Sequence, residues 1–310
     1  MKKKLLVLTA CIAFSTSMTL AQQDKLLTHF IYDKMTLNPG STGLEEGICG
    51  TMIYRNQWDK VNGAPNSAVF NVEANMNRYF PGGLGISFYH DAIGFARQNN
   101  ALLNYSYPIS IPTARATLGI GIGVGIVNFG LNPTWVPPTQ AQDPLLSNAP
   151  VAGTNLDLNA GIYWRENSGK YYVGISSTHL SESTLKNVNY STFRHYNVLG
   201  GYKFFDLFGE KRHLDVQAMV RTDMVKFSAD INVRYLHDNL FYGGLTYRTS
   251  DAIAIMAGFM PFRNFTVGYS YDLTVNKLAN ISRGTHEIAI RYCYFIPPPP
   301  VKKTKNPRWL

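Results

Sequence analysis

Charged residues are scarce in this chain of 310 residues, and long hydrophobic runs are missing beyond its first few dozen positions. Asp, Glu, Lys and Arg together make up 16% of the sequence. No later segment approaches the roughly 18 to 20 consecutive apolar residues of a membrane-spanning helix, which excludes a helical membrane protein. Hydrophobic residues still make up 45% and aromatic residues 13%, enough apolar material to exclude intrinsic disorder.

Acidic residues are too few to balance the basic ones, and the net charge of +9 comes from the two ends of the chain. Lys2, Lys3 and Lys4 open it, and four of the last ten residues are basic, with no Asp or Glu in either stretch. The rest holds 22 of the 29 basic residues against all 20 acidic ones. A nucleic-acid-binding surface needs clustered Lys and Arg within the fold, so we expect no nucleic-acid partner.

The N-terminus has the features of an export signal. Three lysines precede an apolar core, Leu5–Phe14, and Thr19–Ala21 gives the small-x-small pattern that signal peptidases read. We therefore expect residues 1–21 to be a signal peptide and Gln22 to begin an exported mature chain. A lipoprotein signal ending at Cys11 is the alternative, but the apolar stretch before that residue is short for such a use.

The rest of the chain alternates between apolar and polar residues with a period of two, which is the pattern of β-strands. In Phe265–Asp272, Phe, Val and two Tyr occupy one face, and Thr, Gly, Ser and Asp occupy the other. The apolar face is the more uniform one, as expected where it meets lipid while the polar face lines a lumen. The pattern predicts an all-β protein, a transmembrane antiparallel β-barrel of the outer-membrane type.

Fourteen segments can be assigned to strands, and this number is even, as in most outer-membrane barrels. Most are 11 to 14 residues long, enough to cross a hydrocarbon layer at the tilt of a barrel. The barrel domain is predicted over residues 47–295, with strands at 47–58, 66–76, 82–92, 97–110, 116–131, 155–166, 169–181, 193–205, 213–224, 227–238, 240–250, 251–262, 263–276 and 284–295.

The lengths of the predicted connections alternate around this barrel. The longest, 132–154, 182–192 and 277–283, are odd-numbered, whereas even-numbered ones such as 111–115 are mostly short. Outer-membrane barrels combine long extracellular loops with short periplasmic turns. We therefore expect a barrel in contact with outer-membrane lipid, with both termini in the periplasm.

Motifs for catalysis, cofactors and metals are missing. Gly119–Gly125 alternates Gly with Ile or Val but lacks the spacing of a nucleotide-binding loop, so we interpret it as a strand with a smooth lumen face. His286-Glu287 has no second His at the spacing of a zinc protease. A chance pairing of Ser or Asp with one of the seven His leaves a barrel hydrolase as a third interpretation. We expect no enzyme, no cofactor and no metal.

Short motifs occur in a fixed order through the N-terminal third: Gln23-Asp24, His29–Tyr32, Leu37-Asn38-Pro39 continuing to Gly43, Arg55-Asn56-Gln57-Trp58, Asn62-Gly63-Ala64-Pro65, Gly83–Ser87, Asp91–Gly94 and Leu103–Tyr107. This order resembles that of the PorP/SprF family of Bacteroidetes outer-membrane proteins, and His286–Tyr292 is similar to the last strand of that family. The match is dense over residues 23–107 and thinner afterwards. Gly40 and Thr42 stand where small Ala residues are usual, and Asn62 stands where Asp is usual.

The resemblance implies a non-enzymatic component of the type IX secretion system, with a role in gliding or in holding secreted surface proteins in some members. Its partners would be periplasmic and outer-membrane secretion proteins, and also secreted cargo or peptidoglycan-linked proteins. For the motif residues, partner binding and a role in folding stay equally open: residues 62–65 form an expected turn, and Arg55 and Gln57 an expected polar pair facing the lumen. A small-solute channel is the alternative function, because a 14-strand lumen can be open or plugged.

Residues 22–46 are too apolar for a solvated tail. Phe30–Tyr32, Met35 and Leu37 are hydrophobic, and Asn38-Pro39-Gly40 supplies a bend back toward the first strand. We predict that this N-terminal segment blocks the lumen or its periplasmic mouth. Packing against a partner protein is the alternative.

The closing segment, residues 296–310, is rich in proline and basic residues. Pro297–Pro300 cannot join a sheet and favour an extended polyproline II spacer. We predict that this tail is a periplasmic docking element, and a tail without a partner is the alternative. Its cationic side chains and one aromatic anchor suit a protein groove or a cell-wall surface, and they are Lys302, Lys303, Lys305, Arg308 and Trp309.

Only two cysteines, Cys49 and Cys293, remain outside the signal, in an exported and potentially oxidising setting. They lie near the start of the first strand and the end of the last, and closing a barrel makes these two strands neighbours. By parity both share the lumenal face. We predict that they are cross-strand neighbours at the seam, and a disulfide and two free thiols both stay open because stagger could separate them.

Overall fold

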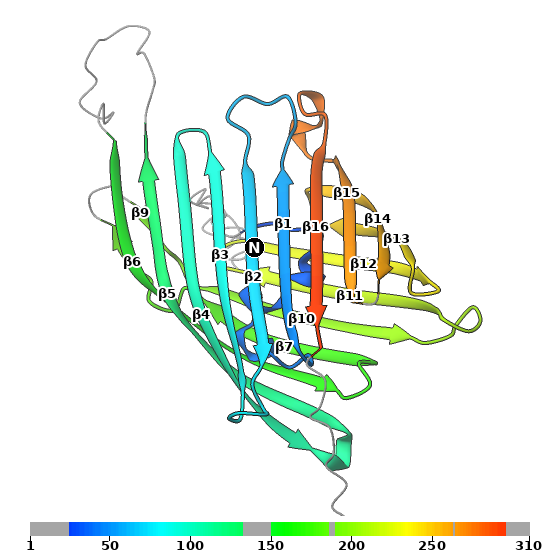
Figure 1. The fold of residues 1–310 in the computed structure, drawn as a ribbon. Coiled ribbons are helices and arrows are strands. Elements are labelled where there is room, and N and C mark those ends of the chain that lie inside the picture. The colour runs from blue at the N-terminus through cyan, green and yellow to red at the C-terminus, as the bar shows by residue number, and fades with distance from the viewer. Residues whose placement is uncertain (1–24, 133–149, 186–189, 263, 296–310) are drawn as a thin grey trace, which may run out of the picture.

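Fourteen antiparallel strands close into one β-barrel in the computed structural model, which describes residues 25–132, 150–185, 190–262 and 264–295 (Figure 1). The first strand pairs with the last, which closes the sheet. This confirms the predicted fold class and the fourteen predicted strands. The barrel strands are β1 (Ile48–Asn56), β2 (Asn66–Asn75), β3 (Gly83–Ile93), β4 (Ala96–Ile111), β5 (Ala116–Leu131), β6 (Val151–Glu166), β7 (Tyr171–Thr178), β10 (His195–Phe204), β11 (Arg212–Thr222), β12 (Phe227–His237), β13 (Phe241–Arg248), β14 (Ala252–Phe262), β15 (Phe265–Thr274) and β16 (Thr285–Tyr294).

The period-two pattern of the sequence separates the two faces of the barrel wall. In β14, Ile253 and Ile255 are exposed on the outside, whereas Ala252, Ala254 and Met256 point inward and are buried. Strand after strand repeats this alternation, so the outside is a belt of apolar side chains and most buried polar residues face the lumen. The outside is therefore suited to lipid.

Some element ends differ from the prediction. The predicted loop 182–192 contains a small separate hairpin, β8 (Thr184–Leu185) with β9 (Tyr190–Ser191). β6 begins at residue 151 rather than 155, because it continues to pair with the end of β5, where Val151 lies opposite Leu131. β7 ends early because the chain turns at the next residue, His179, which has a positive φ.

The four longest connections of the barrel lie at one end, at the top of Figure 1, which we call the long-loop mouth. They are 57–65, 275–284, the connection between β5 and β6 and the connection between β7 and β10, and the short connections 94–95, 223–226 and 249–251 lie at the same end. The other end, the short-turn mouth, carries 76–82, 112–115, 167–170 and 205–211. β1 begins and β16 ends at the short-turn mouth. The longest connections share one end as the sequence predicts, but not every connection at that end is long. The orientation of the barrel in the membrane stays a prediction.

Helices are short in the described residues, and none has the length and apolar character to cross a membrane. Three lie in the N-terminal segment, η1 (Phe30–Tyr32), α2 (Lys34–Leu37) and η2 (Pro39–Ser41), and two in connections, η3 (Pro112–Ala114) and η5 (Lys277–Asn280). The predicted signal peptide, 1–21, and the predicted docking tail, 296–310, lie outside the described residues.

Candidate functional site: a lumen filled by the N-terminal segment

Residues 25–46, the lumen segment, run inside the barrel from the long-loop side to the short-turn mouth, where they lead into β1 (Figure 1). Phe30, Ile31, Met35 and Leu37 are only 2–5% exposed. Phe30, Ile31 and Leu37 pack with inward-facing side chains of β6, β7, β10 and β11, namely Tyr163, Tyr172, Leu199 and Met219. The apolar side chains of the segment are thus buried against the inner wall of its own barrel.

The bend at Asn38-Pro39-Gly40 lies on a floor of glycines. A Cβ on Gly121 of β5 would overlap the backbone of Pro39, and a Cβ on Gly161 of β6 would overlap the Asn38 side chain. The approach is equally close from the other side, since a Cβ on Gly40 would lie 2.8 Å from the carbonyl oxygen of Gly119. The alternating glycines of β5 therefore form the predicted smooth face, and that face lets two backbones pack together.

Side-chain hydrogen bonds fix the bend to the wall. Asn38 Nδ2 donates to the carbonyl oxygens of Ile162 and Ile175, at 2.9 and 3.3 Å, on the neighbouring strands β6 and β7. Its Oδ1 accepts from the Gly40 N–H at 2.9 Å, and Ser106 of β4 donates to the Gly40 carbonyl at the same distance. A buried amide that lacks hydrogen-bond partners costs free energy, and these bonds remove that cost for Asn38.

A chain of buried ion pairs follows the inner wall on the side of the barrel opposite the glycine floor. Every member is at most 2% exposed. Buried charges are tolerated only when they are paired, and here each carboxylate meets more than one cation or donor. The ion pairs run Arg221–Asp230 (3.0 Å), Asp230–Arg248 (2.7 Å), Arg248–Asp272 (3.5 Å), Asp272–Arg55 (2.8 Å) and Arg55–Glu287 (2.9 Å). The imidazole of His29 continues the chain with a contact to Glu287 at 2.8 Å.

The lumen segment is part of this network. The backbone N–H groups of Thr28 and His29 donate to the Glu287 carboxylate at 2.9 and 2.6 Å, and Thr28 Oγ1 donates to Asp272 at 2.8 Å. Arg55, a residue of the family-like motif, donates to Thr28 Oγ1 at 3.2 Å. The charges of the wall therefore bind the backbone of the segment directly.

The other end of the segment is held by Arg291 of β16. Its guanidinium lies 2.6 Å from Glu45 and 3.7 Å from Glu73 of β2, and Glu73 also accepts from the Gly43 N–H at 2.9 Å. The Arg291 charge, against the opposing effect of burial, lowers the pKa of the Glu45 carboxyl to about 2. The pair is thus charged throughout the physiological range.

The remaining motif residues lie in the connection 57–65, at the long-loop mouth. The N–H of buried Gln57 donates to the Pro65 carbonyl at 2.9 Å, which closes the base of this loop. Gly63 has a φ of 74°, a conformation that favours glycine. Trp58, Gly63 and Ala64 line a polar hollow of about 290 Å³. The motif thus divides into a lumenal part, with Asn38, Pro39 and Arg55, and a rim loop.

Cys49 and Cys293 lie directly opposite each other in the β1–β16 ladder. Their Cα atoms are 4.0 Å apart and a disulfide joins them, closing the seam of the barrel near the short-turn mouth. Both side chains face inward and are buried.

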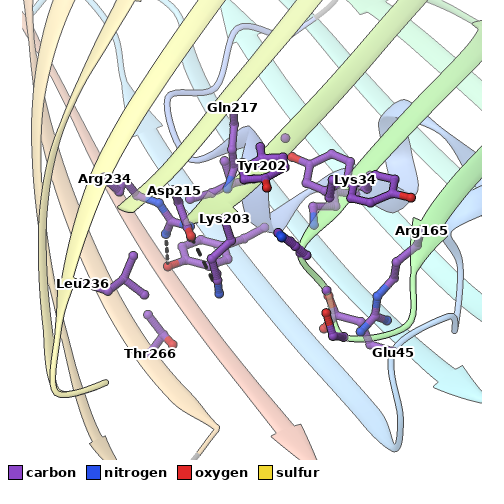
Figure 2. A pocket seen from close by; sticks show the side chains of 18 of the residues that line it. Lys34, Glu45, Arg165, Tyr202, Lys203, Asp215, Gln217, Arg234, Leu236 and Thr266 are labelled. Carbon is purple, nitrogen blue, oxygen red and sulfur yellow. Dashed lines mark hydrogen bonds and ion pairs between the residues drawn. The ribbon is translucent and has the colours of Figure 1, made fainter. Parts of the chain in front are cut away.

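A cavity of about 430 Å³ opens at the short-turn mouth, between the lumen segment and the wall (Figure 2). Lys34 of the segment reaches it, and Lys203, Asp215 and Arg234 border it from β10, β11 and β12. Burial lowers the pKa of the Lys34 ammonium to about 8; the Glu45 charge acts against this, and Arg291, Arg165 and Arg234 add to it.

Sequence reasoning missed the polar residues through which the lumen segment is held. Lys25, Thr28 and His29 of the segment are nearly or fully buried, and Lys25 pairs with Asp33 of the same segment at 3.1 Å. The available signal is the polar face of each strand, which does place Asp272 and similar residues toward the lumen. This pattern shows which side chains point into the lumen but not which of them meet, because pairs across the barrel depend on strand order and stagger.

These features define the class: a 14-stranded β-barrel of the outer-membrane type whose lumen holds its own N-terminal segment, anchored by buried ion pairs and a glycine floor. The profile of the family described as type IX secretion system membrane protein PorP/SprF matches residues 19–292. The chain belongs to this family, as the motifs of its N-terminal third predict.

Several solved barrels have similar shapes. The outer membrane protein Omp33 of Acinetobacter baumannii is 7% identical, with a TM-score of 0.45, over 82% of this chain and 100% of that one. The monoaromatic hydrocarbon channel CymD is 10% identical, with a TM-score of 0.48, over 86% and 93%. Outer membrane phospholipase A of Escherichia coli is 9% identical, with a TM-score of 0.37, over 80% and 90%. Similarity at this level says nothing about function. No curated protein sequence matches the chain.

Proposed function

We propose that this protein is a non-enzymatic outer-membrane component of the type IX secretion system that scaffolds or retains secreted or surface proteins, and that its lumen is plugged by residues 22–46. The observation that carries the proposal is the lumen segment, whose described part is bonded to the inner wall from Thr28 to Glu45. A barrel with a filled lumen acts on other proteins through its rims and outer face.

The proposed orientation gives the two rims different partners. Long loops face outward in outer-membrane barrels, which would place the rim loop 57–65 at the cell surface. The short-turn mouth and both termini would then face the periplasm. Periplasmic secretion components would meet the tail, with Lys302, Lys303, Lys305, Arg308 and Trp309 as the docking side chains.

Deletion of the gene, followed by two assays in the same strain, tests the scaffold proposal. We expect secretion of a reporter cargo to fall, and uptake of small hydrophilic solutes to stay at the level of the parent strain. Complementation with the intact protein should restore secretion. Normal secretion in the deletion strain would contradict the proposal.

A small-solute channel is the alternative, and the same assays distinguish it. A channel predicts slower solute uptake in the deletion strain with little effect on cargo. The cavity at the short-turn mouth is the observation that favours this alternative, since the described residues leave this space open at that end.

A further inference from the structure

The cavity at the short-turn mouth carries a strong excess of positive charge. Of the described residues, two acidic ones line it, Glu45 and Asp215, against six basic ones: Lys34, Arg165, Lys170, Lys203, Arg234 and Arg291. Both acids are already engaged, because Glu45 lies 2.6 Å from Arg291 and Asp215 lies 3.0 Å from Arg234. Clustered charge of one sign in a low-dielectric recess concentrates the opposite ion.

Lys34 is the basic residue of this cavity whose charge is least compensated. Its Nζ lies 4.2 Å from the centre of the Tyr172 ring, and within the described parts of the chain it has neither a hydrogen-bond acceptor nor a carboxylate at bonding distance. A largely buried ammonium without an anion is unfavourable, since cation–π contact replaces only part of its hydration. The lumen segment holds it there all the same, between residues that are themselves fixed to the wall.

Aromatic side chains provide the other surface of the cavity. Three tyrosines line it from inside the barrel, Tyr32, Tyr163 and Tyr172. Tyr163 and Tyr172 are stacked, with ring centres 5.5 Å apart. Tyr171 and Tyr202, which lie opposite each other in the β7–β10 ladder, stack on the outer face of the wall at the rim. Flat rings beside cations recognise ligands that combine an apolar plane with a negative charge.

We propose that this cavity is a binding site for a small organic anion, a phosphate or carboxylate attached to a flat apolar group, with Lys34 and Lys203 as the residues that contact the anion. Its volume, about 430 Å³, falls within the roughly 300–1,000 Å³ usual for small-molecule sites. Lys203 lies 3.8 Å from Asp215 and is partly exposed, so it is able to turn toward a ligand. The site is independent of the secretion role proposed above.

Isothermal titration of the purified full-length protein in detergent tests the site. The probes are phenyl phosphate, benzoate, inorganic phosphate and neutral phenol, at fixed ionic strength. We expect at least one aromatic anion to bind, inorganic phosphate to bind more weakly, and phenol not to bind. A preference for phenyl phosphate or for benzoate identifies the anionic group.

Matched lysine variants locate the binding. K34Q and K203Q should each weaken binding of the preferred anion by about tenfold or more, the size expected for loss of one charge-assisted hydrogen bond. K60Q, which removes an exposed lysine at the opposite mouth, should bind as the parent protein does. Heat-modified migration in gels checks that all three variants fold. The proposal is wrong if neither aromatic anion binds, if phenol binds as well as they do, or if folded K34Q and K203Q keep full affinity.

Discussion

Asn38 makes contacts that link parts of the chain far apart in sequence. Its amide group reaches carbonyl oxygens on two neighbouring strands, and it fits there because Gly161 and Gly174 carry no side chain. The next residues, Pro39 and Gly40, lie against the glycines of β5 in the same way. At the residue scale, the bend and the glycine floor therefore form one packing unit, and its tolerance for added volume is small.

Substitution of Gly121 by Ala tests this unit. The added methyl group overlaps the backbone of Pro39, so we expect a loss of about 1–3 kcal/mol of stability, the usual cost of overpacking. Gly243→Ala is the matched control, since a Cβ there meets nothing within 4 Å. Thermal unfolding in detergent measures both variants, and equal stability of the two would contradict the account.

Lys34 should show its unusual environment in solution. Because burial lowers its pKa to about 8 from the ordinary 10.5, the unfolded chain binds more protons than the folded protein between these values, and stability should rise with pH across that window. Reductive ¹³C-methylation followed by an NMR titration reads the pKa directly. We expect one lysine signal that titrates near pH 8 and is missing in K34Q; titration of that signal near pH 10 would refute the burial.

At the scale of elements, the lumen segment and the wall depend on each other. Arg248 of β13 and Asp272 of β15 reach each other across β14, and they do so because β14 contributes the small inward residues Ala252 and Ala254 at this level. The segment then supplies backbone N–H groups to Glu287 in the same network.

The sequence could predict the strands and their inward polar faces, since the period-two pattern is local. It could also place Cys49 and Cys293 on adjacent strands, because closure of a barrel always joins the first strand to the last. Pairs such as Arg248 with Asp272 could not be predicted, because they depend on strand stagger and on the small side chains between them. The path of the lumen segment was equally hidden, since its contacts come from almost every strand.

Substitution of Glu287 by Gln should loosen the segment. The change leaves Arg55 buried with one carboxylate fewer, and breaking a buried pair costs about 3–5 kcal/mol. We expect trypsin to cut the segment at Lys25 and Lys34 faster than in the parent protein. Glu210→Gln, in the exposed connection 205–211, is the control and should leave the rate unchanged. Equal cleavage of both variants would show that the network does not anchor the segment.

The tail is the element whose role rests on composition alone. Truncation after Phe295 removes four prolines and the basic residues that follow, but no strand of the barrel. We expect the truncated barrel to assemble normally and to lose co-purification with periplasmic secretion components. If co-purification is unchanged, the tail is not the docking element.

At the scale of the whole molecule, the fold combines a closed wall with an occupied interior. The disulfide between Cys49 and Cys293 joins the ends of the sheet, and Gly47 connects the lumen segment directly to that seam. Both ends of the described segment are thus tied to the barrel, at Glu287 near the long-loop side and at Arg291 near the short-turn mouth. We therefore expect the interior to support the barrel more than to transmit solutes.

Single-channel conductance in planar bilayers tests the plug most directly. The intact protein should show little or no steady conductance, whereas a version lacking residues 22–40 should open a stable pore, because the deletion removes the part that fills the lumen between the ion-pair network and the glycine floor. Both proteins should first show the same heat-modified migration, as evidence of a closed barrel. If the intact protein conducts as freely as the shortened one, the lumen segment does not plug the barrel.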